Sequence, residues 1–78
     1  MLHKIKLSKI AETTDVVVVD QWNVAVGDLV TANQSLALLE TDKVTVDLPS
    51  PIAGRVTELL VGQGEEARTG DQMCVIEA

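Results

Sequence analysis

Most residues of this 78-residue chain that could carry out chemistry stand alone in the sequence. His3 is the only histidine and Cys74 the only cysteine, and they lie at opposite ends of the chain, so no cluster of metal ligands is expected. Nothing in the sequence places a serine or cysteine nucleophile beside His3. We therefore expect Cys74, which lies in an apolar run, to be a small buried residue and the chain to be no enzyme by itself.

One lysine has a more informative setting. Residues 40–44 (Glu-Thr-Asp-Lys-Val) connect an expected strand that ends at Leu39 to an expected strand that begins at Val44. Asp42 favours a turn because its carboxylate can accept hydrogen bonds from nearby backbone N–H groups. At the tip of such a hairpin, the amine of Lys43 would be held in solvent on a rigid base. A lysine in a turn is ordinarily only a solvated charge, so this spacing alone does not make Lys43 a site.

Composition excludes several classes of protein. The net charge of −6 has the wrong sign for a nucleic-acid or anionic-membrane binder. The longest aliphatic runs have four residues, against roughly 20 for a membrane span. The N-terminus alternates instead of carrying an apolar core, which does not fit a signal peptide, and a single cysteine cannot form an internal disulfide. We expect a cytoplasmic protein, or one of the mitochondrial matrix in a eukaryote.

The elements that position these residues are predicted to be strands. Turn residues separate five short apolar runs at roughly ten-residue spacing, which is typical of a sandwich or barrel. No window of helix length carries an apolar stripe, so the fold class is all-β in one domain, residues 1–78. Four glycines are expected at positive-φ turn positions. The runs are Val16–Val19, Leu36–Leu39, Val44–Val46, Val56–Val61 and Met73–Ile76, and the glycines are Gly27, Gly54, Gly64 and Gly70.

An internal repeat sharpens this prediction. A shift of 37 positions places the segment Val24–Glu40 on Val61–Glu77, with glycine on glycine, acid on acid and apolar on apolar residues. Each copy would hold a turn, a short strand, a loop and a longer strand. Neither copy can bury its apolar face alone, so we expect them to pack about a pseudo-twofold axis as a flattened barrel. The turn at residues 41–43 and the C-terminus would then occupy equivalent corners at opposite ends.

The segments around this turn closely resemble the lipoyl domains of the E2 components of 2-oxo acid dehydrogenase complexes. The resemblance extends from about Ile5 to Ile76, and its motifs lie in register with one another. The family implies a flattened eight-stranded barrel-sandwich of two four-stranded sheets with pseudo-twofold symmetry, in agreement with the repeat. The matching segments are residues 22–30, 40–44 and 48–56 with Gly64 and Gly70-Asp71.

The resemblance implies a single lipoyl-type carrier domain with lipoic acid amide-linked to Lys43. Asp42 and Val44 would be the flanks that the modifying enzyme recognises, either a lipoate ligase or an octanoyltransferase acting with lipoyl synthase. In such complexes a thiamine-dependent E1 acylates the lipoyl group reductively. An E2 acyltransferase core then passes the acyl group to coenzyme A, and a flavin-dependent E3 reoxidises the dithiol.

The first surface loop departs from the family pattern. That loop usually has the form Leu-Pro-x-Ile-Gly-Glu-Gly, and here the proline and both glycines are replaced. In the family this loop helps E1 recognise its own domain, so we expect a partner-recognition loop whose cognate 2-oxo acid complex the sequence does not identify. Its residues are Ser8, Lys9, Ile10, Ala11, Glu12, Thr13, Thr14 and Asp15.

Two alternatives share the same fold. A biotinyl carrier domain of a carboxylase typically has methionine on both sides of its lysine, whereas the neighbours of Lys43 are Asp42 and Val44. The flanking residues therefore favour lipoylation. An unmodified barrel-sandwich adaptor is the other alternative, although a purely structural turn would have no reason to carry the full motif.

Overall fold

The computed structural model describes residues 1–7, 16–42 and 44–78. These residues form eight β-strands, consistent with the short β-branched and aliphatic runs of the sequence. Glycine, proline, aspartate or asparagine, which favour turns, follows each strand from β2 to β7 within three residues. The strands are β1 (Leu2–Lys6), β2 (Val16–Trp22), β3 (Leu29–Val30), β4 (Ser35–Glu40), β5 (Thr45–Pro49), β6 (Gly54–Leu59), β7 (Glu66–Arg68) and β8 (Gln72–Glu77).

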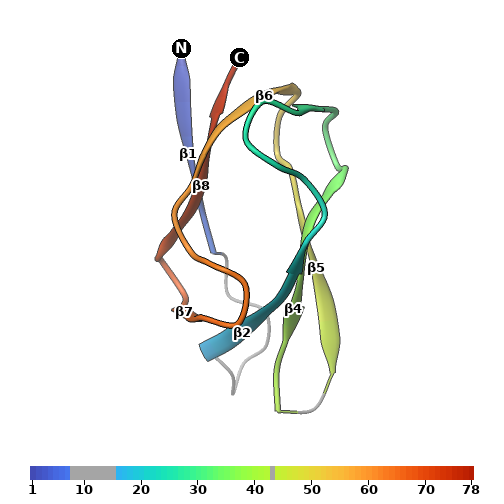
Figure 1. The fold of residues 1–78 in the computed structure, drawn as a ribbon, viewed down its shortest axis with the longest axis vertical. Coiled ribbons are helices and arrows are strands. Elements are labelled where there is room, and N and C mark those ends of the chain that lie inside the picture. Colours follow the sequence, from blue (N-terminus) through green and yellow to red (C-terminus); the bar gives the residue numbers. More distant parts are fainter. Residues whose placement is uncertain (8–15, 43) are drawn as a thin grey trace.

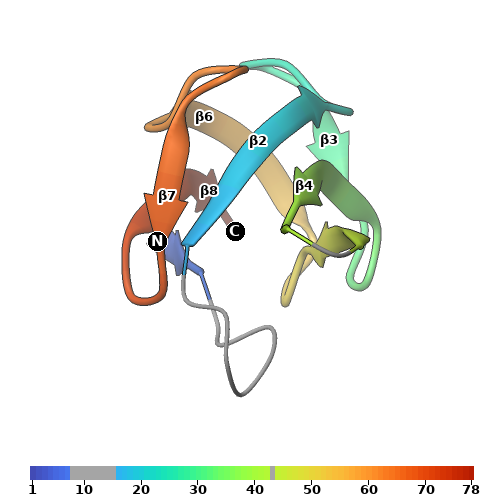
Figure 2. The ribbon, with the colours of Figure 1, turned by 90° about the horizontal axis from the view of Figure 1, so that it is seen from below.

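The strands form two four-stranded antiparallel sheets, in the orders β1-β8-β6-β3 and β5-β4-β2-β7. The domain measures 33 × 20 × 18 Å along its principal axes. Figure 1 shows the two chain termini side by side at one end of the long axis and the β4–β5 hairpin at the other. Viewed along that axis, the strands surround a central core (Figure 2). The predicted all-β fold with two four-stranded sheets is confirmed.

The 37-residue repeat appears in the register of both sheets. Val18 pairs with Glu40 in one sheet, and Arg55 pairs with Glu77 at the matching place in the other. The register shift that follows Val19 in β2 has its counterpart after Val56 in β6. The two halves are therefore equivalent down to their β-bulges.

The core is aliphatic, and the two inner faces of the sheets supply it. Removing this apolar surface from water is the main force that holds the two halves together, because neither sheet can bury its inner face alone. The one tryptophan, Trp22, packs partly buried against this core, and its indole Nε1 donates a hydrogen bond to the carbonyl oxygen of Val61 at 2.8 Å. The fully buried side chains include Val17, Val19, Leu36, Leu39, Val56, Met73, Cys74 and Ile76.

Four glycines were expected at turn positions with positive φ, and Gly27, Gly64 and Gly70 do have positive φ. The prediction is wrong for Gly54, whose φ is not positive. Gly54 begins strand β6. A Cβ atom there would lie 2.7 Å from Cγ2 of Ile76 and would also press on the backbone of Glu77. Glycine is needed at this position because β6 and β8 approach closely, and not because of its dihedral angle.

Candidate functional site

The β4–β5 hairpin forms the end of the molecule opposite the termini (Figure 1). Its last paired residues are Glu40 and Thr45, which face each other across the two strands. The chain between them turns through residues 41–44. Lys43, the predicted attachment residue, lies outside the described residues, but its neighbours Asp42 and Val44 are both described. Because antiparallel pairing stops directly beneath the turn, the turn stands on a fixed base.

Thr41 closes this turn with both its backbone and its side chain. Its backbone N–H donates to the carbonyl oxygen of Val44 at 2.8 Å. Its hydroxyl donates to the same oxygen at 2.8 Å and accepts a hydrogen bond from the Val44 backbone N–H at 3.0 Å. Both backbone polar groups of Val44 are therefore bonded to Thr41. The turn is held from its first residue to its fourth.

The turn is exposed above a buried layer. Asp42 is exposed, and Val44 keeps 57% of its surface accessible although its side chain is apolar. Directly below, Leu39 on β4 has no exposed surface. Exposed residues on a hydrogen-bonded turn anchored in the core are well suited to contact another protein. Val44 was predicted to begin a strand, but the structure places it in the turn because Thr41 binds both its backbone groups.

Thr41 is the residue at this site that the sequence analysis missed. Its signal was the presence of a threonine at the first position of a four-residue turn, where hydroxyls often bond to backbone groups further along the chain. The sequence analysis assigned the capping role to the neighbouring Asp42 instead. In the structure, the hydroxyl bonds that close the turn belong to Thr41.

The predicted partner loop, residues 8–15, lies outside the described residues. Its length can still be compared with the equivalent connection in the other half. β1 corresponds to β5 at an offset of 43 residues, because Leu2 pairs with Glu77 as Thr45 pairs with Glu40. The other strands correspond at an offset of 37, so the β1–β2 connection is six residues longer than the β5–β6 connection. The six residues by which the two halves differ in length therefore belong to the connection between β1 and β2.

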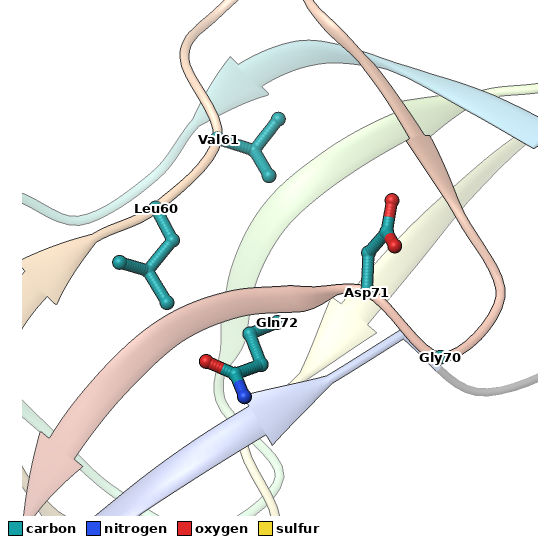
Figure 3. Close-up of a pocket in the computed structure, with 5 residues that line it drawn as sticks. All are labelled: Leu60, Val61, Gly70, Asp71 and Gln72. Carbon is teal, nitrogen blue, oxygen red and sulfur yellow. The ribbon is translucent and has the colours of Figure 1, made fainter.

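A concave region lies between the β6–β7 connection and the β7–β8 turn (Figure 3). It is lined by Leu60, Val61, Gly70, Asp71 and Gln72. The carboxylate of Asp71 accepts a hydrogen bond from the Arg68 backbone N–H at 2.9 Å, so it caps the β7–β8 turn. These lining residues include no amine, thiol or imidazole, and they offer no attachment chemistry.

The remaining reactive side chains have structural settings. His3 is half-buried on β1, and Cys74 has no exposed surface in β8. Burial raises the pKa of the Cys74 thiol to about 11, so the thiolate form is disfavoured. Within residues 1–7, 16–42 and 44–78, no three acidic, histidine or cysteine residues gather where they could hold a metal ion. The same part of the chain contains no helix long and apolar enough to cross a membrane.

Known proteins resemble this chain in sequence and in fold. Residues 3–76 match the family model described as "Biotin-requiring enzyme". The chain is 37% identical, over 97% of its length, to the acetyltransferase component of the pyruvate dehydrogenase complex of Acholeplasma laidlawii. It is 40% identical, over 96% of its length, to the lipoamide acyltransferase component of the branched-chain alpha-keto acid dehydrogenase complex of Pseudomonas aeruginosa. The chain spans only 14% and 18% of these two proteins.

Two solved structures share the fold. The lipoyl domain of the 2-oxoglutarate dehydrogenase complex of Azotobacter vinelandii superposes with a TM-score of 0.76 at 21% identity, over 96% of this chain and 95% of that domain. The urea carboxylase of Kluyveromyces lactis superposes with a TM-score of 0.83 at 21% identity, over 99% of this chain and 6% of that protein. A lipoyl domain and a carboxylase therefore both have this fold, and the two sequence relatives are acyltransferase components of dehydrogenase complexes. This chain belongs to the biotinyl/lipoyl attachment family.

Proposed function

We propose that this chain is a single lipoyl carrier domain, residues 1–78, with lipoic acid in amide linkage to the side-chain nitrogen of Lys43. The observation that carries the proposal is the exposed four-residue turn, closed by Thr41, in a chain of this family whose sequence relatives are E2 acyltransferase components. The domain performs no catalysis of its own. It carries acyl groups and reducing equivalents between the enzymes of a 2-oxo acid dehydrogenase complex.

In this function the protein positions the lipoyl group and holds it where it can reach other proteins. When bound, the lipoyl group supplies a dithiolane that is reduced and acylated, and that chemistry belongs to the cofactor. The hairpin supplies the root of the arm, held in solvent at one end of a domain 33 Å long. A linker joined to either terminus would leave from the opposite end, where the termini lie together (Figure 1). Tethering raises the concentration of the carried group at each partner's active site.

The flanks of Lys43 support lipoic acid over biotin. Asp42 and Val44 stand where a biotinyl domain typically has methionines, and both are exposed, so a modifying enzyme can reach them. The relatives named above are acyltransferase components of dehydrogenase complexes. The likeness to urea carboxylase, at 21% identity, concerns the fold alone. We infer that Asp42 and Val44 are contacts for a lipoate ligase or octanoyltransferase.

The partners that follow from this proposal are a thiamine-dependent E1, an E2 acyltransferase core and a flavin-dependent E3. Residues 8–15 form the proposed recognition loop for E1. Support for this role comes from its added length, because six residues beyond the equivalent connection are not needed to join two strands of this fold. The cytoplasm, where bacterial dehydrogenase complexes work, is the proposed location.

Intact mass after modification tests the proposal. The unmodified chain is incubated in parallel with a lipoate ligase and with a biotin ligase, each with its acid and ATP. Lys43→Arg keeps the positive charge but removes the amine nucleophile, and Lys4→Arg is the matched control on an exposed strand position. We expect the mass of one lipoyl group on the wild-type chain and on Lys4→Arg, and none on Lys43→Arg.

Each other outcome rejects part of the proposal. A mass gain with biotin alone would move the chain to the carboxylase carriers. No gain in either reaction, from a chain whose circular dichroism shows folded β-structure, would favour an unmodified adaptor. A lipoyl gain on Lys43→Arg would show that the wrong lysine has been assigned.

A further inference from the structure

The turn that carries Lys43 is closed differently from four other turns in the part of the chain that the structure describes. Two pairs of turns, related by the repeat, each use a side chain at the fourth position that accepts from the backbone N–H of the first. Asp28 accepts from Ala25 at 2.9 Å, and Glu65 accepts from Gly62. In the second pair, Gln34 accepts from Thr31 at 3.0 Å and Asp71 from Arg68 at 2.9 Å. These turns fix only their first N–H group with a side chain.

The turn at residues 41–44 reverses this arrangement. The side chain belongs to the first residue, Thr41, and it bonds to both the N–H and the carbonyl group of the fourth residue, Val44. The backbone of the residue that follows Lys43 is therefore fixed from two sides. Any change in the path of residues 42–43 that moves the Val44 backbone must break these bonds.

The pseudo-equivalent corner shows that strand pairing does not need this hydroxyl. The repeat relates Thr41 to Ala78 and Val44 to Met1. There the Ala78 backbone N–H donates to the Met1 carbonyl oxygen at 3.0 Å, which matches the Thr41–Val44 backbone bond of 2.8 Å. Alanine has no hydroxyl, yet β1 and β8 remain paired from Leu2 opposite Glu77 onward. At that corner the Met1 amino group donates to the Ala78 carbonyl oxygen at 3.0 Å, whereas the equivalent Val44 N–H donates to the Thr41 hydroxyl. The hydroxyl thus takes the place of a backbone acceptor at the corner that carries the lysine, and it adds a bond to the Val44 carbonyl oxygen.

We propose that Thr41 is a positioning residue for modification, whose hydroxyl holds the turn in the conformation that presents Lys43 to the lipoate-attaching enzyme. This inference rests on the proposed function of Lys43. Thr41 does not touch the reacting atoms in this account. A turn that is free to move would spend part of its time in conformations that the enzyme cannot bind, and its apparent affinity would fall by that fraction.

The test compares four variants with the wild-type chain. Thr41→Val removes the hydroxyl with little change in shape, Thr41→Ala is a second variant without it, and Thr41→Ser retains it. Thr57→Val is the matched control, because the Thr57 hydroxyl donates to the Val75 carbonyl oxygen at 3.2 Å within the other sheet. Lipoate ligase kinetics give KM and kcat for each domain, and amide exchange followed by NMR reports on the Val44 N–H group.

We expect the KM of Thr41→Val and Thr41→Ala to rise about fivefold with kcat within about twofold, since only the population of the competent conformation changes. The Val44 amide should exchange faster in the same two variants. Thr41→Ser should restore both values, and Thr57→Val should leave both at the wild-type level. A fall in kcat with an unchanged KM would indicate that Thr41 acts on the reacting atoms, and it would overturn the positioning role.

Three further results would also overturn it. One is a wild-type KM in Thr41→Val and Thr41→Ala. Another is a KM for Thr41→Ser as high as that for Thr41→Val, which would implicate the threonine methyl group instead of the hydroxyl. The third is an equal loss in Thr57→Val, which would indicate general destabilisation. If the wild-type chain takes up no lipoate at all, the proposed function fails as well, so the two failures are distinguished by the wild-type reaction.

Discussion

The two corners related by the repeat differ in three ways. At one, the chain is continuous through residues 41–44 and Thr41 closes the turn, whereas at the other the termini meet through Ala78 and Met1. The first corner also carries the lysine of the family motif. Among the described residues, the two halves share the register of their long strands, their bulges and two pairs of turn caps. We infer that these shared features maintain the fold and that the features found only at the corner of residues 41–44 serve function.

Gly54→Ala should produce the largest change in stability, because a Cβ atom would meet Ile76 and the Glu77 backbone where β6 and β8 approach. The free energy of unfolding should fall by about 3 kcal/mol, at the upper end of the range for overpacking. Urea denaturation measures it. Gly62→Ala is the control, since the nearest atoms to its Cβ all belong to the Glu65 side chain and none to the backbone. Equal losses in the two variants would contradict the close-approach explanation.

Cys74 gives the next largest effect. Its counterpart in the other half is the buried Ala37, so Cys74→Ala is a matched variant. The pKa of the Cys74 thiol is raised to about 11, so the unfolded chain releases this proton at lower pH than the folded one. The stabilisation is present below about pH 9 and is lost as the pH rises toward 11.

By pH 11 the wild-type chain should lose about 2 kcal/mol more than Cys74→Ala, in which the two halves match at this position. Chemical denaturation of both proteins between about pH 8 and about pH 11 measures the difference. Parallel pH curves for the two proteins would show that the thiol is not protected by burial.

Gly27 and Gly64 should have a smaller and equal effect. They are equivalent in the repeat, with φ values of 97° and 85°, and open space surrounds the position of a Cβ atom at both. Alanine at either position should cost about 1–2 kcal/mol of unfolding free energy from backbone strain alone. Thermal denaturation of the two variants compares them directly. A clear inequality would mean that the two halves are not energetically equivalent.

The fold could be predicted well from the sequence for two reasons. The strand pattern is a local feature of the chain, and the repeat shows which distant positions are equivalent. The 37-residue shift paired Leu36 with Met73 and Leu39 with Ile76, and all four are fully buried. Gly54 was misassigned because its requirement comes from a neighbouring strand distant in sequence, which local turn chemistry does not reveal.

The candidate site was predicted less completely. The motif identified the turn and its exposed flanks, Asp42 and Val44, because the residue types there are characteristic of the family. The role of Thr41 could not be derived, since a threonine in a turn bonds to the backbone only when the turn brings Val44 within reach. Whether Lys43 is modified, and which partner reads residues 8–15, depends on other proteins.

Mapping the modified lysine tests the central claim most directly. The chain has four lysines, Lys4, Lys6, Lys9 and Lys43, and the account assigns the lipoyl group to the turn where the two halves differ. Peptide mass spectrometry of the chain, after reaction with a lipoate ligase, locates the added mass. The account predicts that Lys43 alone carries it. A lipoyl group on Lys4, Lys6 or Lys9, with Lys43 unmodified, would contradict the account.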